Sequence, residues 1–67
     1  MSTFGETRQR IKRAKKHAND FANQMFMIWN TYKDQFPGFA AIAEKHAEIG
    51  LQMTLACDTL DALLMTL

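Results

Sequence analysis

Hydrophobic residues along this chain follow two heptad ladders that are separated by a single Pro-Gly pair at residues 37–38. In each ladder the apolar side chains recur at the a and d positions, a spacing that places them in one stripe along a helix. The pattern predicts an all-α chain with one helix at about 4–35, a turn at 36–38 and a second helix at about 39–66. The first ladder comprises Phe4, Ile11, Ala14, Ala18, Phe21, Met25, Ile28 and Tyr32. The second comprises Phe39, Ile42, His46, Ile49, Met53, Ala56, Leu60, Leu63 and Leu67.

The residues between the ladders predict a reversal of the chain. Phe36 precedes a proline and is therefore disfavoured in helical geometry, while Pro37 suits the first position of a following helix. Gly38 tolerates the dihedral angles that a sharp turn requires. We therefore expect residues 1–67 to form a single antiparallel helical hairpin with coiled-coil packing, in which the two ladders face each other.

Three residues add expectations about the two helices. Thr3 followed by Glu6 matches a capping box at the start of the first helix. His46 occupies an a position, where we expect a buried ring that is hydrogen-bonded to the Tyr32 hydroxyl. Gly50 costs about 1 kcal/mol of helix propensity relative to alanine, which predicts close approach of another helix at that point.

The charge is divided unevenly between the two halves of the chain. Residues 1–33 hold seven Lys and Arg against two acids, whereas residues 34–67 hold one Lys against five acids. In an antiparallel hairpin, the basic start of the first helix would lie beside Asp58 and Asp61. The charge pattern thus supports the same hairpin as the hydrophobic pattern.

A hairpin of 67 residues leaves one side of each helix uncovered, so its core is small without a second copy or a partner. We therefore expect a homodimer that forms a four-helix bundle. In overall plan the chain is similar to the small plasmid-encoded RNA-binding hairpins that dimerise in this way. The similarity concerns architecture alone and transfers no functional residue.

Apolar residues outside the two ladders are candidates for contacts with a second copy or with a target protein. Those at e positions, beside the ladder, include Trp29 and Leu64 and suit the inner face of a symmetric dimer. Those further round the helices suit a target protein, because aromatic and Met side chains bury large areas and adapt their shape. The full set of predicted partner or dimer contacts is Phe26, Met27, Trp29, Leu51, Leu55 and Leu64.

Cations crowd into residues 8–17 and spread over more than half of the helix circumference. Such a segment can follow a phosphate backbone, dock on an acidic protein surface or face solvent beside the acids of the second helix. It contains no aromatic residue that could stack on a base. The candidate contacts are Arg8, Arg10, Lys12, Arg13, Lys15 and Lys16.

The chain shows no motif for catalysis, for a cofactor or for a metal ion, so we expect no enzymatic activity. Its one cysteine, Cys57, cannot form an internal disulfide, and we see neither a signal peptide nor a membrane segment, so we expect a cytoplasmic location. Our leading hypothesis is a small regulator or inhibitor of a larger protein, of the kind that phages and plasmids encode against host machinery. The alternative hypothesis is a dimeric hairpin that binds RNA or DNA through residues 8–17.

Overall fold

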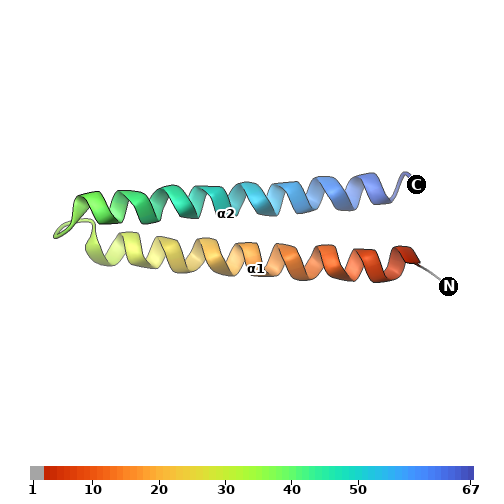
Figure 1. The fold of residues 1–67 in the computed structure, drawn as a ribbon, viewed down its shortest axis with the longest axis horizontal. Coiled ribbons are helices and arrows are strands. Elements are labelled where there is room, and N and C mark those ends of the chain that lie inside the picture. Colours follow the sequence, from red (N-terminus) through yellow and green to blue (C-terminus); the bar gives the residue numbers. More distant parts are fainter. Residues whose placement is uncertain (1–2) are drawn as a thin grey trace.

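The computed structural model describes the backbone of residues 3–67 and the side chains of residues 4–67. Within that range the chain forms two α-helices, α1 (Thr3–Tyr32) and α2 (Pro37–Leu64), which run antiparallel and side by side along their whole length (Figure 1). The predicted all-helical hairpin is therefore confirmed. The predicted capping box depends on the Thr3 side chain, which lies outside the described side chains.

The reversal begins a few residues earlier than the sequence suggested. α1 ends at Tyr32 rather than near Gln35, and the Phe36 amide donates to the Tyr32 carbonyl at 2.8 Å across the turn. Phe36 lies outside helical geometry, with φ −133° and ψ 71°, as is favoured for a residue that precedes proline. Pro37 is the first residue of α2, so Gly38 lies inside the helix and does not have a positive φ.

Small residues line the contact between the two helices. Gly50 lies close to the other helix, because a Cβ atom added there would stand 3.0 Å from the Cβ of Ala22 and 3.2 Å from the carbonyl oxygen of Ala18. The close approach predicted at Gly50 is therefore confirmed. We call the buried residues the small-residue seam, and among the described side chains they are Ala18, Ala22, Ala40, Ala43, Ala47, Gly50 and Cys57.

The predicted packing of the second ladder is wrong. Ile42 and Leu60 were expected to face the first helix, yet 60% and 54% of their surfaces are exposed in this chain. The row of α2 that contacts α1 is displaced by one residue along the sequence, so that Ala43 takes the place of Ile42 and Ala47 that of His46. A displacement of one residue turns the contacting side of an α-helix by about 100°.

Two consequences follow from this rotation of α2. The small side chains let backbone and Cβ atoms of the two helices touch directly, which gains dispersion contacts that bulky side chains would prevent. His46 is exposed rather than buried, and its Nδ1 lies 2.8 Å from the carbonyl oxygen of Ile42 instead of facing Tyr32. Tyr32 instead packs its ring edge-on against Phe39 at 5.5 Å.

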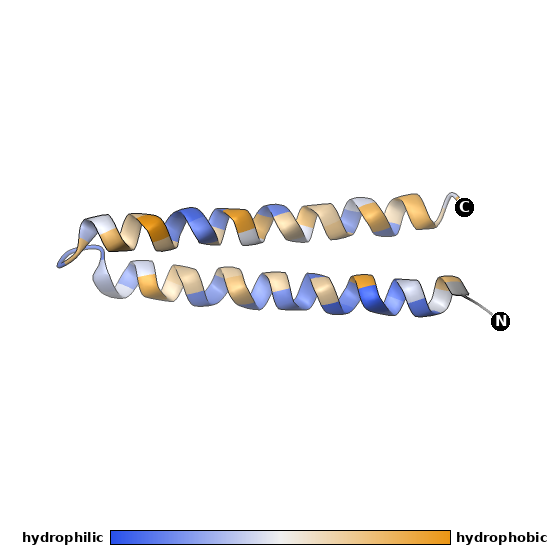
Figure 2. Ribbon diagram, viewed as in Figure 1, coloured by the Kyte–Doolittle hydropathy of each residue, from blue (hydrophilic) through white to orange (hydrophobic). Residues whose placement is uncertain are grey.

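The hairpin is a flat slab with extents of 54 × 15 × 10 Å. Its radius of gyration is 15.5 Å, whereas a compact domain of this length has about 11 Å. Hydrophobic residues recur along the whole of α2, while hydrophilic residues dominate the half of α1 nearer the N-terminus (Figure 2). Over the described part of the chain, neither helix combines the length and apolarity that crossing a membrane takes.

Candidate interaction surfaces

The seam divides the slab into two broad faces that can be told apart by helical spacing. In an α-helix, residues three before and three after a given position lie on opposite flanks of it, about 60° to either side. In two antiparallel helices, the residues three before a seam position lie on one side of the slab in both helices, and the residues three after a seam position lie on the other side. Lys15 stands three residues before Ala18, and Asp58 one residue after Cys57, which are displacements of about 60° and about 100° in the same sense. Their side chains pair at 2.6 Å on one side of the slab, in agreement with this rule.

The apolar face lies on the other side of the slab. Phe21 and Met53 stand three residues after Ala18 and Gly50, and the ring of Phe21 reaches to 3.1 Å from the position of a Gly50 Cβ. Most of its side chains are exposed although they are large and hydrophobic. The apolar face comprises Phe21, Ile28, Tyr32, Phe39, Ile42, Ile49, Met53 and Leu60. These eight residues carry no charge and extend from the turn nearly to the open end of the hairpin.

The opposite side, which we call the ion-pair face, holds two contacts between the helices. Lys15 Nζ donates to Asp58 at 2.6 Å, and Arg8 Nε lies 3.2 Å from Asp61. The hydrogen bond to Asp58, reinforced by the charge of that carboxylate, raises the pKa of Lys15 above its ordinary value. The predicted pairing of the basic start of α1 with Asp58 and Asp61 is therefore confirmed.

The four residues that we expected to contact a target lie away from the apolar face. Phe26 is half-buried and, like Leu51, flanks the seam on the ion-pair side, with Leu55 one turn further along α2. Met27 lies on the side of α1 that points away from α2, and 63% of it is exposed. We call these four residues the interaction patch: Phe26, Met27, Leu51 and Leu55.

The two residues that were expected to line a dimer from e positions are drawn into the hairpin itself. Trp29 is half-buried, and the Lys33 ammonium stands 4.6 Å from the centre of its ring, a cation–π contact. Leu64 is half-buried at the open end of the hairpin. The sequence pattern could not show that these side chains are half-buried within the hairpin, because it does not reveal which of two neighbouring rows on α2 contacts α1.

The cations of the basic segment differ in their partners. Lys16 pairs weakly with Asp20 at 3.7 Å on the same helix. Within residues 4–67, Arg10, Lys12 and Arg13 are exposed and form no ion pair. A surface hollow of about 270 Å³ lies beside two of them and is lined by Glu6, Gln9, Arg10 and Arg13.

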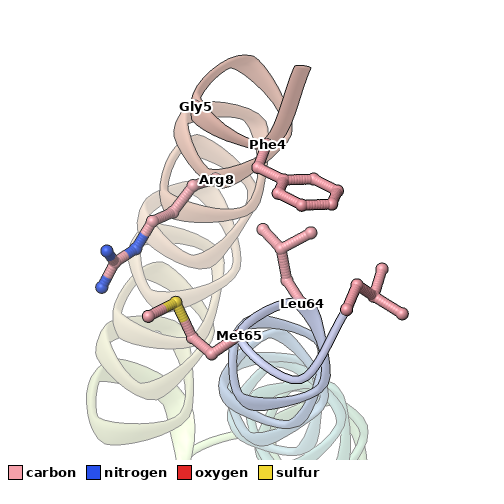
Figure 3. Close-up of a pocket in the computed structure, with 6 residues that line it drawn as sticks. Phe4, Gly5, Arg8, Leu64 and Met65 are labelled. Carbon is pink, nitrogen blue, oxygen red and sulfur yellow. The ribbon is translucent and has the colours of Figure 1, made fainter. Parts of the chain in front are cut away.

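A second hollow of about 300 Å³ opens where the helix ends meet, and the sequence pattern did not predict it. The ring of Phe4 faces the side chain of Leu64, while the guanidinium of Arg8 extends away from them (Figure 3). The hollow is thus walled mainly by apolar side chains from the two ends of the chain. Its lining residues are Phe4, Gly5, Arg8, Leu64, Met65 and Leu67.

Titratable side chains do not gather into a chemical centre in the part of the chain that the structure covers. No group of three or more His, Cys, Asp or Glu stands close enough together there to hold a metal ion. Cys57 is buried in the small-residue seam. Comparison of the chain with protein-family models, with curated proteins and with solved structures gives no match. The features of the described residues that bear on function are therefore their exposed surfaces.

Proposed function

We propose that this chain is a non-enzymatic interaction protein of the cytoplasm that regulates or inhibits a larger protein. It acts as a homodimer in which two hairpins form a four-helix bundle, and it binds its target through the interaction patch with the basic segment as a flank. A phage or plasmid origin suits so short a regulator, in which case the cytoplasm is that of the host cell.

The observation that carries this proposal is the position of the interaction patch. Leu55 is 64% exposed although it is a large hydrophobic residue, and with Leu51 it lies away from the long apolar face. A second copy that covered the apolar face would leave Leu51 and Leu55 accessible. Exposed hydrophobic side chains that are surrounded by polar residues are typical of protein-binding sites.

The basic segment on α1, rather than the immediate surroundings of the patch, favours a partner with an acidic surface. Arg10, Lys12 and Arg13 project from the same helix as Phe26 and Met27 and form no ion pair within the described residues. Such cations raise the rate at which an acidic partner is encountered, while the apolar anchors supply most of the affinity.

The test compares capture of proteins from a host lysate by three tagged forms of the chain: wild type, Leu55→Asp and Gln52→Asp. Both substitutions place a carboxylate on an exposed position of α2, but only Leu55 belongs to the patch. We expect a protein that wild type and Gln52→Asp capture and that Leu55→Asp loses, with unchanged circular dichroism. Identical capture by all three forms would contradict the proposal. Leu55 is preferred to Phe26 because Phe26 is half-buried and its replacement disturbs the hairpin.

Nucleic-acid binding is the alternative, and the unpaired Arg10, Lys12 and Arg13 favour it. Glu6 opposes it, because its carboxylate lines the same hollow as Arg10 and Arg13 and repels a phosphate. Replacement of these three cations by Gln is the discriminating variant, since Arg8 and Lys15 already form ion pairs between the two helices. If this alternative holds, the slope of log affinity against log salt for duplex DNA falls by about 2.7 in that variant. Failure of the wild-type protein to bind DNA or RNA at low salt eliminates it.

A further inference from the structure

The described part of the hairpin buries no large side chain completely. Its buried residues are alanines, one glycine and one cysteine, while most of the large hydrophobic side chains are exposed and the others, among them Trp29 and Leu64, are only half-buried. Hydrophobic stabilisation scales with the apolar area removed from water, at about 25 cal/mol per Å². A hairpin that removes mainly small side chains therefore lacks most of the stabilisation that its own composition offers.

The exposed area of the chain shows how much surface remains unburied in comparison with a compact protein. The chain exposes 5214 Å², whereas a compact monomer of 7.7 kDa exposes about 4,300 Å². The excess of about 900 Å² is similar to the 800 Å² that each partner loses in a protein–protein interface of standard size. One interface of ordinary extent would thus bring the chain to the surface area of a compact protein.

The form of the apolar face indicates the shape of what covers it. Phe39, Ile42, Ile49, Met53 and Leu60 keep heptad spacing over most of α2, and α1 does not occupy this row. His46 is the one polar residue in this row between Phe39 and Leu60, and a heptad row of this length packs best against helices of similar length. A slab 54 Å long and 10 Å thick, stacked on an equal slab, gives the cross-section of a four-helix bundle.

We propose that a second copy of this chain covers the apolar face, so that its eight residues form the core of the homodimer. This inference rests on the homodimer in the proposed function and assigns its surface, in place of the e-position residues that the sequence suggested. A face on which folding depends must be covered as soon as the chain is made. A second copy is the one partner that is always present in equal amount, and it has the required length.

The first test is the mass in solution, measured by sedimentation equilibrium over a range of concentrations. We expect wild type to have twice the chain mass of 7.7 kDa. Ile42→Lys, which places a charge on the apolar face, should raise the dimer dissociation constant roughly 100-fold or more. The matched control is Ala41→Lys, which adds the same charge one residue earlier on an exposed position outside the apolar face, and it should leave the dimer intact.

The second test uses the unmodified protein and remains valid if Ile42→Lys fails to fold. Met53 belongs to the apolar face and Met27 does not, yet in the single chain 50% and 63% of them are exposed. Oxidation by dilute peroxide, read by mass spectrometry, should slow at least tenfold at Met53 as the concentration rises into the dimer range, and should stay constant at Met27.

Three results would overturn the inference: the mass of a single chain at every concentration, a dimer unaffected by Ile42→Lys, or equal oxidation of Met53 and Met27 in the dimer. These outcomes are separate from the test of target binding. Loss of capture by Leu55→Asp does not depend on how Met53 reacts. A dimer that protects Met53 can equally exist if Leu55→Asp captures the same proteins as wild type.

Discussion

Two rows of residues on α2, displaced by one position in the sequence, have opposite roles. Ala43, Ala47 and Gly50 form the row that receives α1, and the helices touch there almost backbone to backbone. Ile42, His46 and Ile49 form the next row, which faces outward in the single chain. The comparison shows that burial in this chain does not follow side-chain size, because the row of small residues is buried and the neighbouring row, with two isoleucines, is exposed.

The largest effect should come from a large side chain at Gly50 in the small-residue seam. In Gly50→Leu, the first added atom already lies 3.0 Å from the Cβ of Ala22 and 3.2 Å from a backbone oxygen, so the helices must move apart. We expect a loss of about 3 kcal/mol in the free energy of unfolding, measured by urea denaturation.

Gly38→Leu is the matched control, because nothing lies within 4 Å of a Cβ atom at Gly38. The same substitution there should change the free energy of unfolding by less than about 1 kcal/mol and in the stabilising direction, since leucine favours the helix over glycine. Equal losses in the two variants would show that the helices do not meet at Gly50.

The sequence predicted the hairpin and its charge pairing because both depend on features that are independent of helix rotation. Pro37 marks the reversal, and Lys15 and Asp58 lie at matching heights along antiparallel helices. The rotation of α2 could not be predicted in the same way. Both rows have heptad spacing, and in this chain the row that faces the neighbouring helix is the one with small residues rather than the one with large residues.

The candidate sites were predicted to a similar extent. Exposed Leu51 and Leu55 could be found from their position outside the ladder. Most residues of the apolar face were predicted to be buried between the two helices and are exposed instead. Trp29, which was predicted to line a dimer, is half-buried in the single chain. Distinguishing these surfaces requires the angle at which the two helices meet, which the spacing of one chain does not contain.

Neighbouring residues on α2 should respond in opposite ways to the same replacement, with a smaller effect than at Gly50. Ala47→Leu overfills the seam, where Ala47 is fully buried, and should destabilise the protein by about 1 to 3 kcal/mol. His46→Leu should instead stabilise the dimer by about 1 kcal/mol, because it replaces a polar group beside the apolar face by a hydrophobic one.

Urea denaturation at two protein concentrations separates these effects, since only the gain at His46 should grow with the concentration of dimer. Stabilisation by Ala47→Leu would mean that the seam has room for large side chains. It would also remove the contrast between the two rows.

The smallest effect concerns the ion-pair face and appears only in alkaline solution. The pKa of Lys15 is raised in the folded chain by its hydrogen bond to Asp58, so this ammonium binds its proton more tightly when folded than when unfolded. The resulting stabilisation is complete below the unfolded pKa of about 10.5 and is lost as the pH rises through the folded pKa. Thermal unfolding should therefore show wild type losing its advantage over Lys15→Gln as the pH rises above about 10.5.

The comparison with Lys15→Gln isolates this residue from other groups that titrate in the same range. Lys16→Gln, whose partner Asp20 lies on the same helix at 3.7 Å, serves as the control and should keep the pH dependence of wild type. A constant difference between wild type and Lys15→Gln over this range would show that the Lys15–Asp58 pair does not stabilise the hairpin, which would leave the seam and the Arg8–Asp61 pair to join α1 and α2.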